Sequence, residues 1–293
     1  MRSRDFSINS IAYLLDKKCL FDPLNGINDL ELALIRTHSE RNLLNDPLRI
    51  LRFFRFVSEL NFKIDLKLIT FIKKNKVKLY LAAKERINYE IQKIANGVNA
   101  LDAVMLIKKI NIFGTAYLYE DSFFLDLEKI NYVEFNQEEK EKFLPSFFIA
   151  QILDVKSLEK LQFSKVEIAK TKLLRKWYFF LRNKSTAQLD ELDRFKLHQE
   201  LEMFFPSFIF YLPQNYRLDW LNRWREKNDK LFHPSNLING DIIKKNLKIK
   251  DGPILGELLY YLSKELAYKR LNNFDEAIYK AKRWIEQNAP KCD

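Results

Sequence analysis

The chain has 293 residues, 47% of them hydrophobic, so it is long enough to bury a core and to form more than one domain. Its 6 glycines and 8 prolines are too few for the many turns of an all-β sandwich or barrel, so the composition predicts a mainly helical protein. The formal net charge of +11 attracts polyanions such as nucleic acid, although a lysine-rich composition without such a partner explains it equally well.

The few cysteines and histidines do not favour a metal centre or a disulfide framework. Cys19 and Cys292 lie at opposite ends of the chain, and His38, His198 and His233 are scattered among unrelated surroundings. No segment approaches the roughly 18 consecutive apolar residues of a membrane span, and the N-terminal residues lack the apolar core of a signal peptide. We therefore expect a cytoplasmic protein with no membrane partner.

The first elements along the chain are short. Residues 4–15 fit neither the helical nor the strand period and are expected to be a strand or helix of a mixed domain. Residues 19–21 predict a short strand, which "DPLNGINDLE" stops with turn chemistry around Gly26. Either Asn28 or Asp29 is expected to cap a short helical turn that follows.

Helical patterns dominate the rest of the chain. A helix is predicted from Asp46, a second over 65–75, and two more in "KERINYEIQKIANG" and "ALDAVMLIKKINIFG", with Gly97 as a stop. Residues 120–235 predict packed helices with an aromatic core, and breaks are expected near Pro145, Pro206 and Pro213. The apolar side of the first helix consists of Leu48, Leu51, Phe54, Val57 and Leu60.

Four segments in order carry more information than their periodicity. "RDFSINSIAY", "DPLNGINDLELALIR" and "NDPLRILRFFRF" follow one another near the N-terminus, and "LINGDIIKKNLKIKDGPILGELL" lies near the C-terminus. Together they resemble class II tRNA nucleotidyltransferases, which are CCA-adding enzymes, and bacterial poly(A) polymerases. The resemblance implies an elongated, mainly α multi-helix protein, preceded by a small remnant of an α/β nucleotidyltransferase head. The implied domains are the head remnant (1–36), a nucleotide-selecting and RNA-binding neck (37–115), a helical body (116–235) and a helical, tRNA-binding tail (236–293).

The helix in "NDPLRILRFFRF" suggests a protein template for a nucleobase. Asp46, Arg49 and Arg52 recur at three-residue steps, which brings Asp46 and Arg49 to one side of a helix. Cytosine and adenine both present an amino donor beside a ring-nitrogen acceptor, and a carboxylate with a guanidinium complements that edge. The alternative is an exposed ion pair worth roughly a few tenths of a kcal/mol. The resemblance implies the selecting role, although Asn45 stands where the family usually has Glu.

The resemblance implies roles for three further groups of residues. The opening motif would contact the ribose and triphosphate of the nucleotide, although Ser3 replaces its first arginine and leaves one guanidinium fewer for phosphate. The next motif would link head and neck motions, a role compatible with forming a turn and a helix cap. A neck pair would buttress the nucleotide-binding helix. These groups are Arg4, Asp5 and Asn9; Asp22, Gly26 and Asp29; and Glu85 with Arg86.

A basic segment near the C-terminus is a candidate RNA contact. Its four lysines precede Gly252-Pro253, where the free amides at a helix N-terminus would accept a phosphate. A solvated lysine face is the alternative, and it is favoured for each lysine taken singly. The residues are Lys244, Lys245, Lys248, Lys250 and Gly252.

The metal-binding carboxylates of the family have no counterpart in this sequence. The family uses two Mg²⁺ ions held by a D-x-D pair next to a Gly-Ser loop, and ATP and CTP as substrates. We therefore expect a tRNA 3′-end CCA-addition or repair protein that is inactive alone. The start is truncated, or a separate polypeptide completes the head, or the chain is a noncatalytic helical module that binds tRNA or another structured RNA. The sequence does not separate CCA addition from poly(A) tailing.

Overall fold

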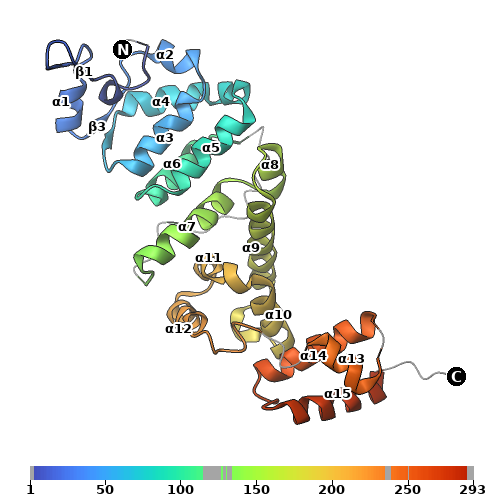
Figure 1. The fold of residues 1–293 in the computed structure, drawn as a ribbon. Coiled ribbons are helices and arrows are strands. Elements are labelled where there is room, and N and C mark those ends of the chain that lie inside the picture. Colours follow the sequence, from blue (N-terminus) through green and yellow to red (C-terminus); the bar gives the residue numbers. More distant parts are fainter. Residues whose placement is uncertain are drawn as a thin grey trace. The chain divides into compact units, whose positions relative to one another are not determined.

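The structure is a computed structural model that describes residues 3–114, 127, 130, 134–234, 239–249 and 251–288. The described part is mainly helical, with two small two-stranded sheets near the N-terminus (Figure 1). This confirms the predicted fold class. The chain divides into two compact units, Met1–Arg175 and Lys176–Asp293, and the boundary falls within helix α9 (Lys165–Asn183).

The N-terminal segment alternates short helices and strands. The 3₁₀ helix η1 (Ser7–Asn9) precedes strand β1 (Ala12–Leu14), which explains why residues 4–15 fit neither period. β1 pairs antiparallel with β2 (Cys19–Phe21), as predicted for that strand. Helix α1 (Gly26–Glu31) begins earlier than expected, because Asn25 adopts the left-handed conformation. Asn28 and Asp29 therefore lie inside α1, and the prediction that one of them caps it is wrong.

Helix α3 (Arg49–Glu59) is the centre of the first unit. The predicted start at Asp46 is wrong, since Asp46 has extended backbone at the end of α2 (Glu40–Asn45). The apolar side of α3 is buried as expected at Leu51 and Phe54, although Leu60, just after this helix, is only half-buried. The helices predicted at 65–75 and in the two later segments are confirmed. They are α4 (Leu66–Asn75), α5 (Lys84–Ala95) and α6 (Ala100–Ile110), and β3 (Leu34–Ile35) pairs in parallel with β4 (Lys63–Ile64) just before α4.

A close approach of backbones fixes α3 against α5 and α6. A Cβ at Gly97, between α5 and α6, would lie 2.5 Å from the Ser58 carbonyl oxygen of α3. The same carbonyl accepts a hydrogen bond of 2.8 Å from the Asn99 amide. Gly97 thus ends α5 as predicted and also allows the two segments to touch, which no larger residue permits.

Helix α7 (Gln137–Ile152) passes through the break that was predicted at Pro145. An interior proline costs a helix about 3 kcal/mol or more through its missing donor and a steric clash. α7 offsets this cost by burying Phe147 and Ile152 and by a reciprocal capping box between Asn136 and Glu139. It is followed by α8 (Val155–Lys160) and α9.

The second unit consists of helices around an aromatic core. α10 (Glu191–Leu201), α11 (Phe205–Phe208) and α12 (Gln214–Arg225) surround buried aromatic residues, as expected. Pro206 lies in the first turn of α11 and Pro213 directly precedes α12, so these prolines mark helix starts.

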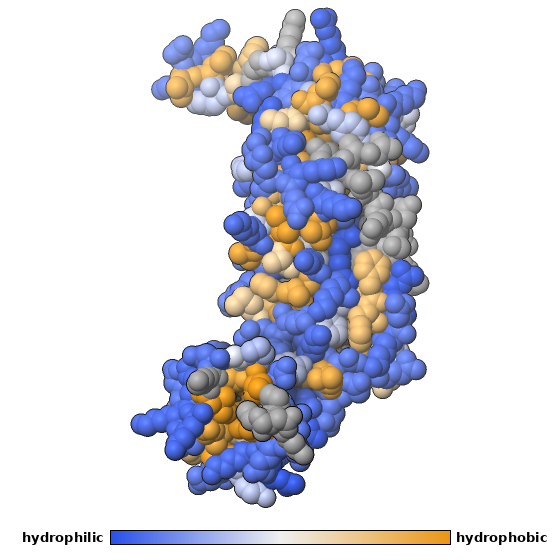
Figure 2. All heavy atoms as spheres, turned by 90° about the vertical axis from the view of Figure 1, so that its right-hand side faces the viewer, coloured by the Kyte–Doolittle hydropathy of each residue, from blue (hydrophilic) through white to orange (hydrophobic). Residues whose placement is uncertain are grey.

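The C-terminal helices form their own apolar cluster within this unit. α13 (Gly240–Leu247), α14 (Pro253–Ala267) and α15 (Phe274–Asn288) confirm the predicted final helices. They pack around Ile243, Leu258 and Leu262, and apolar side chains gather over this part of the face in Figure 2.

Charged side chains attach α14 and α15 to α10. Arg270 binds Glu191 of α10 at 2.7 Å and Glu265 of α14 at 3.1 Å. Glu265 also accepts from Lys280 of α15 at 2.6 Å. One arginine and one buried glutamate thus connect three helices.

None of the helices in the part of the chain that the structure describes has the length and apolarity needed to cross a lipid bilayer.

A buried histidine lies in the aromatic core of the second unit. The ring of His198 lies 3.9 Å from that of Phe232 and 5.0 Å from that of Trp220, measured between centroids. Neither ring nitrogen has a hydrogen-bond partner among the described residues. Burial, reinforced by the charges of Arg223 and Arg194, holds the pKa of His198 well below its ordinary value.

We therefore predict that acid destabilises the second unit through His198. In the unfolded chain this histidine takes up a proton near pH 6.5, whereas the folded state resists protonation, so the free energy of unfolding falls as pH drops below about 6.5. All four tryptophans lie in this unit, so fluorescence-detected urea unfolding at pH 7.5 and 5.5 measures the effect. His198→Leu should remove much of the difference between the two pH values. An undiminished difference would contradict the prediction.

Candidate functional site

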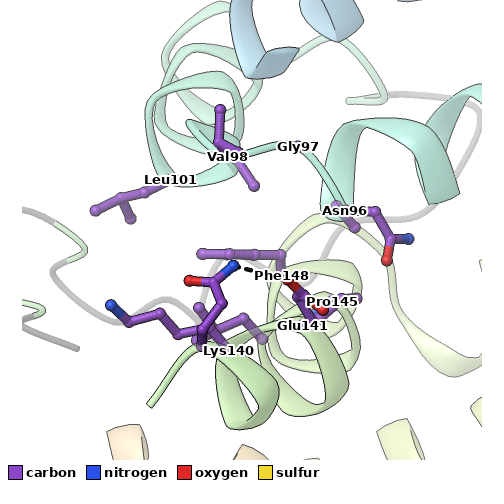
Figure 3. Close-up of a pocket in the computed structure, with 12 residues that line it drawn as sticks. Asn96, Gly97, Val98, Leu101, Lys140, Glu141, Pro145 and Phe148 are labelled. Atoms are coloured by element: carbon purple, nitrogen blue, oxygen red, sulfur yellow. Dashed lines mark hydrogen bonds between the residues drawn. The ribbon is translucent and has the colours of Figure 1, made fainter. Parts of the chain in front are cut away.

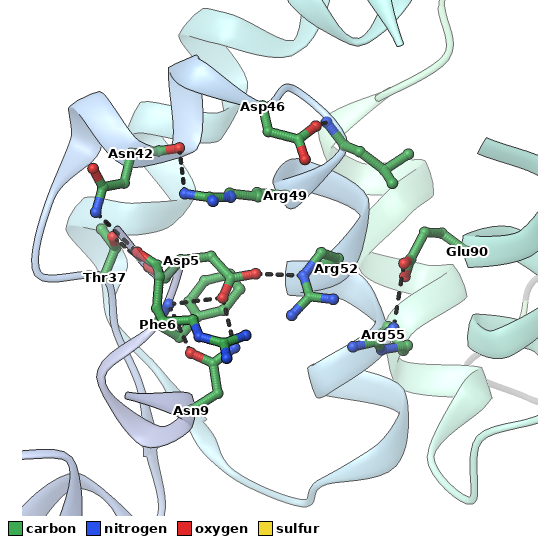
Figure 4. A network of polar contacts seen from close by, with 12 residues as sticks. Asp5, Phe6, Asn9, Thr37, Asn42, Asp46, Arg49, Arg52, Arg55 and Glu90 are labelled. Atoms are coloured by element: carbon green, nitrogen blue, oxygen red, sulfur yellow. Dashed lines mark hydrogen bonds and ion pairs between the residues drawn. The ribbon is translucent and has the colours of Figure 1, made fainter. Parts of the chain in front are cut away.

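Asp5 and Arg52 join the N-terminal segment to α3. The Asp5 carboxylate is buried and forms an ion pair with the Arg52 guanidinium, 47 residues away in the chain (Figure 4). It also accepts hydrogen bonds from the Asn9 amide at 2.5 Å and from the Phe6 backbone at 3.2 Å. Burial alone would raise the pKa of Asp5, but the bonds from Arg52 and Asn9 outweigh it and lower the pKa. The carboxylate is therefore ionised at neutral pH.

Asn42 forms hydrogen bonds with both Arg4 and Arg49. The side-chain amide of Asn42 donates to the Arg4 carbonyl at 2.9 Å, and the Arg49 guanidinium donates to the Asn42 carbonyl at 2.9 Å. Thr37 donates to the Asp5 carbonyl at 2.8 Å. Four of the predicted nucleotide-binding residues, Asp5, Asn9, Arg49 and Arg52, thus lie together around the start of α3 (Figure 4). Arg4 joins them through its hydrogen bond with Asn42.

Asp46 has different partners from Arg49. Its carboxylate accepts from the Leu48 amide at 3.2 Å and from the Arg86 guanidinium of α5 at 2.9 Å. The two side chains were expected to share one helix side, but only Arg49 is helical. Both still flank the first turn of α3, and the role of Asp46 in base selection stays a prediction. Arg86 contacts Asp46 directly, whereas Glu85 is exposed.

The sequence analysis missed Arg55 and Glu90. Arg55 donates to the buried Glu90 carboxylate of α5 at 3.2 Å and also faces Glu59 at 3.5 Å. Burial raises the pKa of Glu90, and the charges of Arg55 and Arg52 only partly oppose it. Two features of the sequence indicate these residues. Arg55 continues the three-residue spacing of Arg49 and Arg52, and Glu90 is a charged residue within the apolar face of α5.

Asp22, Gly26 and Asp29 hold α1 against η1. The Asp22 carboxylate accepts from the Gly26 amide at 2.7 Å and from the Ile27 amide at 2.8 Å, so it caps α1 from outside the helix. Hydrogen bonds from Ile27 and Gly26 lower its pKa despite some desolvation. Asp29 is fully buried, accepts from the Ser7 hydroxyl, and binds Arg36 at 2.6 Å. This motif supports the segment that carries Asp5 and Asn9.

The predicted RNA-binding lysines differ in their surroundings. Lys244 binds Asp241 at 2.8 Å and Asp251 at 3.0 Å, and these hydrogen bonds raise its pKa. Lys245 and Lys248 are exposed, whereas Lys250 lies outside the described residues. Gly252 directly precedes α14 in extended conformation, with no atom within 4 Å of a Cβ built there.

The described residues do not fit a catalytic metal. Within 3–114, 134–234, 239–249 and 251–288, no group of three or more His, Cys, Asp or Glu side chains is arranged to hold a metal ion. The carboxylates of the site, Asp5 and Asp46, are each bound to an arginine. Each of these two carboxylates is thus already neutralised by a guanidinium.

A cavity of about 360 Å³ lies elsewhere in the first unit. It is bounded by the turn between α5 and α6 and by α7, with Asn96, Lys140 and Phe148 among its lining residues (Figure 3). None of the predicted site residues lines it, so it is separate from the network around Asp5.

Known proteins resemble this chain over most of its length. The Poly A polymerase head domain family matches residues 1–36. The CC-adding tRNA nucleotidyltransferase of Synechocystis sp. is 25% identical, over 94% of this chain and 73% of the relative. Two solved structures share the fold alone. A CCA-adding enzyme with CTP has a TM-score of 0.71 at 19% identity, over 97% of this chain and 72% of that one. The Thermotoga maritima CCA-adding enzyme complexed with tRNA has a TM-score of 0.67 at 18% identity, over 97% of this chain and 73% of that one.

The segment that matches the Poly A polymerase head domain is thus joined through Asp5 and Arg52 to helix α3 of a mainly helical chain. The chain is thus similar to a CC-adding tRNA nucleotidyltransferase in sequence, and to CCA-adding enzymes in fold.

The contact between α1 and η1 yields a prediction on stability. A Cβ at Gly26 would lie 2.3 Å from the Ser7 carbonyl oxygen, a backbone atom that cannot move without displacing η1. Gly26→Ala should therefore lower the free energy of unfolding by about 1–3 kcal/mol, as overpacking does. Gly256→Ala is the control, because no atom lies within 4 Å of its Cβ and alanine favours a helix. Equal midpoints in chemical denaturation for Gly26→Ala and the wild type would contradict the contact.

Proposed function

We propose that this protein acts in adding C and A residues to the 3′ end of tRNA, with CTP and ATP as substrates. The observation that carries the proposal is the ion pair of Asp5 with Arg52, because it attaches the segment matching the head domain to the helix that carries Arg49. The related proteins are named as CC-adding or CCA-adding enzymes, which supports the same activity here.

The residues around α3 bind different parts of the nucleotide. Asp46 and Arg49 select the base, since a carboxylate accepts from the amino group of C or A and a guanidinium donates to the ring nitrogen. Arg4 and Asn9 contact the ribose and phosphates. Asp5 and Arg52 hold the two segments in register and add their own polar groups to the site.

Binding of tRNA falls to the helical remainder of the chain. The net charge of +11 favours a polyanion, and Lys245 and Lys248 near the start of α14 are exposed for phosphate contacts. Lys244 contributes less, because Asp241 and Asp251 already neutralise it. The tRNA named in the Thermotoga maritima complex supports this partner.

The complete enzyme needs Mg²⁺, which would align the 3′ hydroxyl and the α-phosphate. Since the described residues offer no metal site, the carboxylates are supplied by a head segment with the D-x-D pair. We propose that this segment either precedes residue 1 in a longer chain or comes from a separate polypeptide, and that the enzyme acts in the cytoplasm. Poly(A) tailing shares the same motifs and is a second outcome of the test below.

The first prediction concerns activity. Residues 1–293 alone should incorporate no nucleotide into tRNA lacking its 3′ end, and adding a head segment with the Gly-Ser loop and the D-x-D pair should restore incorporation. Labelled CTP and ATP, followed by sequencing of the product, distinguish C and CCA addition from a poly(A) tail. The head segment alone is the control. Binding of tRNA without any incorporation in the mixture would favour the noncatalytic module and reject the enzyme.

The second prediction concerns the choice of base. In the completed enzyme, Asp46→Ala should reduce the preference for C and A over U and G roughly 5- to 150-fold, which corresponds to about 1–3 kcal/mol for one bidentate pairing. Asp102→Ala, an exposed aspartate in the first turn of α6, is the matched control. Competition between labelled nucleotides measures the ratio. A preference unchanged from that of the control would reject Asp46 as a selecting residue.

A further inference from the structure

A run of lysines without acidic residues covers α4 and the segment that follows it. Residues 66–84 contain six lysines and neither aspartate nor glutamate, so this stretch carries a formal charge of +6, against +11 for the whole chain. The run extends over α4, the 3₁₀ helix η2 (Lys76–Leu81) and the first residue of α5. Its lysines are Lys67, Lys73, Lys74, Lys76, Lys78 and Lys84.

Lys76 ties this run to the end of α6. Its ammonium group donates to the Ile110 carbonyl at 3.1 Å and to the Asn111 carbonyl at 2.8 Å. The ends of α4 and α6, which both carry lysines in their last turns, are thereby held together. Four exposed lysines around this junction form the lysine cluster: Lys73, Lys74, Lys78 and Lys109.

The charges of the lysine cluster are not neutralised within the described part of the chain. None of its four members forms an ion pair there, whereas Lys244 binds two aspartates. Helix stability explains only part of this placement. Cations are favourable in the last turn of a helix and unfavourable in the first, yet Lys67 and Lys84 lie in the first turns of α4 and α5. The excess of positive charge therefore favours a polyanionic partner.

The lysine cluster lies close to the candidate site along the chain. Arg86 follows Lys78 by eight positions and binds Asp46 at 2.9 Å. Eight residues span at most about 29 Å, which corresponds to roughly eight nucleotides of one strand at 3.4 Å per nucleotide. A nucleic acid whose 3′ end lies at the candidate site therefore reaches the cluster with the phosphates nearest that end.

We propose that the lysine cluster binds backbone phosphates of an RNA acceptor end, within about eight nucleotides of the 3′ terminus. The inference rests on the proposed function and deepens it, because it assigns to the first unit a phosphate contact separate from the lysines near α14. Lysine is a compact charge that neutralises a phosphate without reading a base, so the contact serves RNAs of different sequence.

The test measures RNA binding without any nucleotide, by fluorescence anisotropy. The chain of 293 residues is titrated into a labelled RNA hairpin that reproduces an acceptor stem with a single-stranded 3′ end. The cluster variant, Lys73→Gln with Lys74→Gln and Lys78→Gln, should weaken binding at least roughly tenfold at 0.1 M salt. The plot of log affinity against log salt concentration should become shallower by about 2–3, since each lost phosphate contact removes about 0.9 from the slope.

A second triple variant is the matched control, because it removes the same charge from exposed positions of the second unit. Its substitutions are Lys196→Gln, Lys227→Gln and Lys230→Gln. It should bind the hairpin like the wild type. All six side chains are exposed, so both variants should keep the wild-type circular dichroism and thermal midpoint.

Three results would overturn the proposal. They are no binding of the hairpin by the wild type, equal binding by the two triple variants, and a cluster variant that loses affinity for vesicles of phosphatidylcholine and phosphatidylserine but keeps its affinity for RNA. The last result would assign the lysine cluster to a membrane surface, with Leu81 of η2, 80% exposed, as an apolar contact.

Failure of this proposal is separate from failure of the proposed function. If the hairpin binds as expected but the completed enzyme incorporates no nucleotide, the RNA contact stands and the proposed function fails. If nucleotides are incorporated and the two triple variants bind RNA alike, the proposed function stands and the lysine cluster has no part in it.

Discussion

The ion pair of Asp5 with Arg52 is the interaction on which the candidate site depends. It bridges 47 residues of sequence and places the N-terminal segment on helix α3. Two charges with little exposure are costly to desolvate, and they are tolerated only where further hydrogen bonds satisfy them. Asn9 and the Phe6 amide supply those bonds to Asp5. Removing either partner would leave the other charge unpaired in the same place.

Helix α3 carries three arginines at three-residue steps, and each guanidinium binds a different partner. Arg49 holds α2 through the Asn42 carbonyl, Arg52 holds Asp5, and Arg55 holds Glu90 on α5. Three-residue steps on a helix turn gradually around its axis, so successive arginines face different neighbours. One helix thereby connects the head segment, the preceding helix and α5 around a single polar centre.

Periodicity was enough to predict the long helices, because buried residues such as Ile87, Ile91 and Ile94 repeat on one face. It failed where local contacts compete with it. Pro145 is tolerated within α7 because the packing of that helix outweighs the lost hydrogen bond, and no local signal reveals that packing. The start of α3 was misplaced because Asp46 has extended backbone, with its side chain bound to Leu48 and Arg86. Ion pairs between distant segments, such as Arg55 with Glu90, depend on the tertiary structure and cannot be read from periodicity. Glu90 within the apolar face of α5 was the one sequence feature that indicated this pair.

The charged attachment of α14 and α15 to α10 has a consequence for experiments on RNA affinity. Arg270 and Glu191 are both largely exposed, so mobile ions weaken their attraction over distances of about 10 Å at 0.1 M ionic strength. Counterion release from RNA depends on the same variable. In a test of the proposed tRNA binding, the dependence of affinity on salt concentration would therefore combine phosphate neutralisation with screening of the ion pair between Arg270 and Glu191.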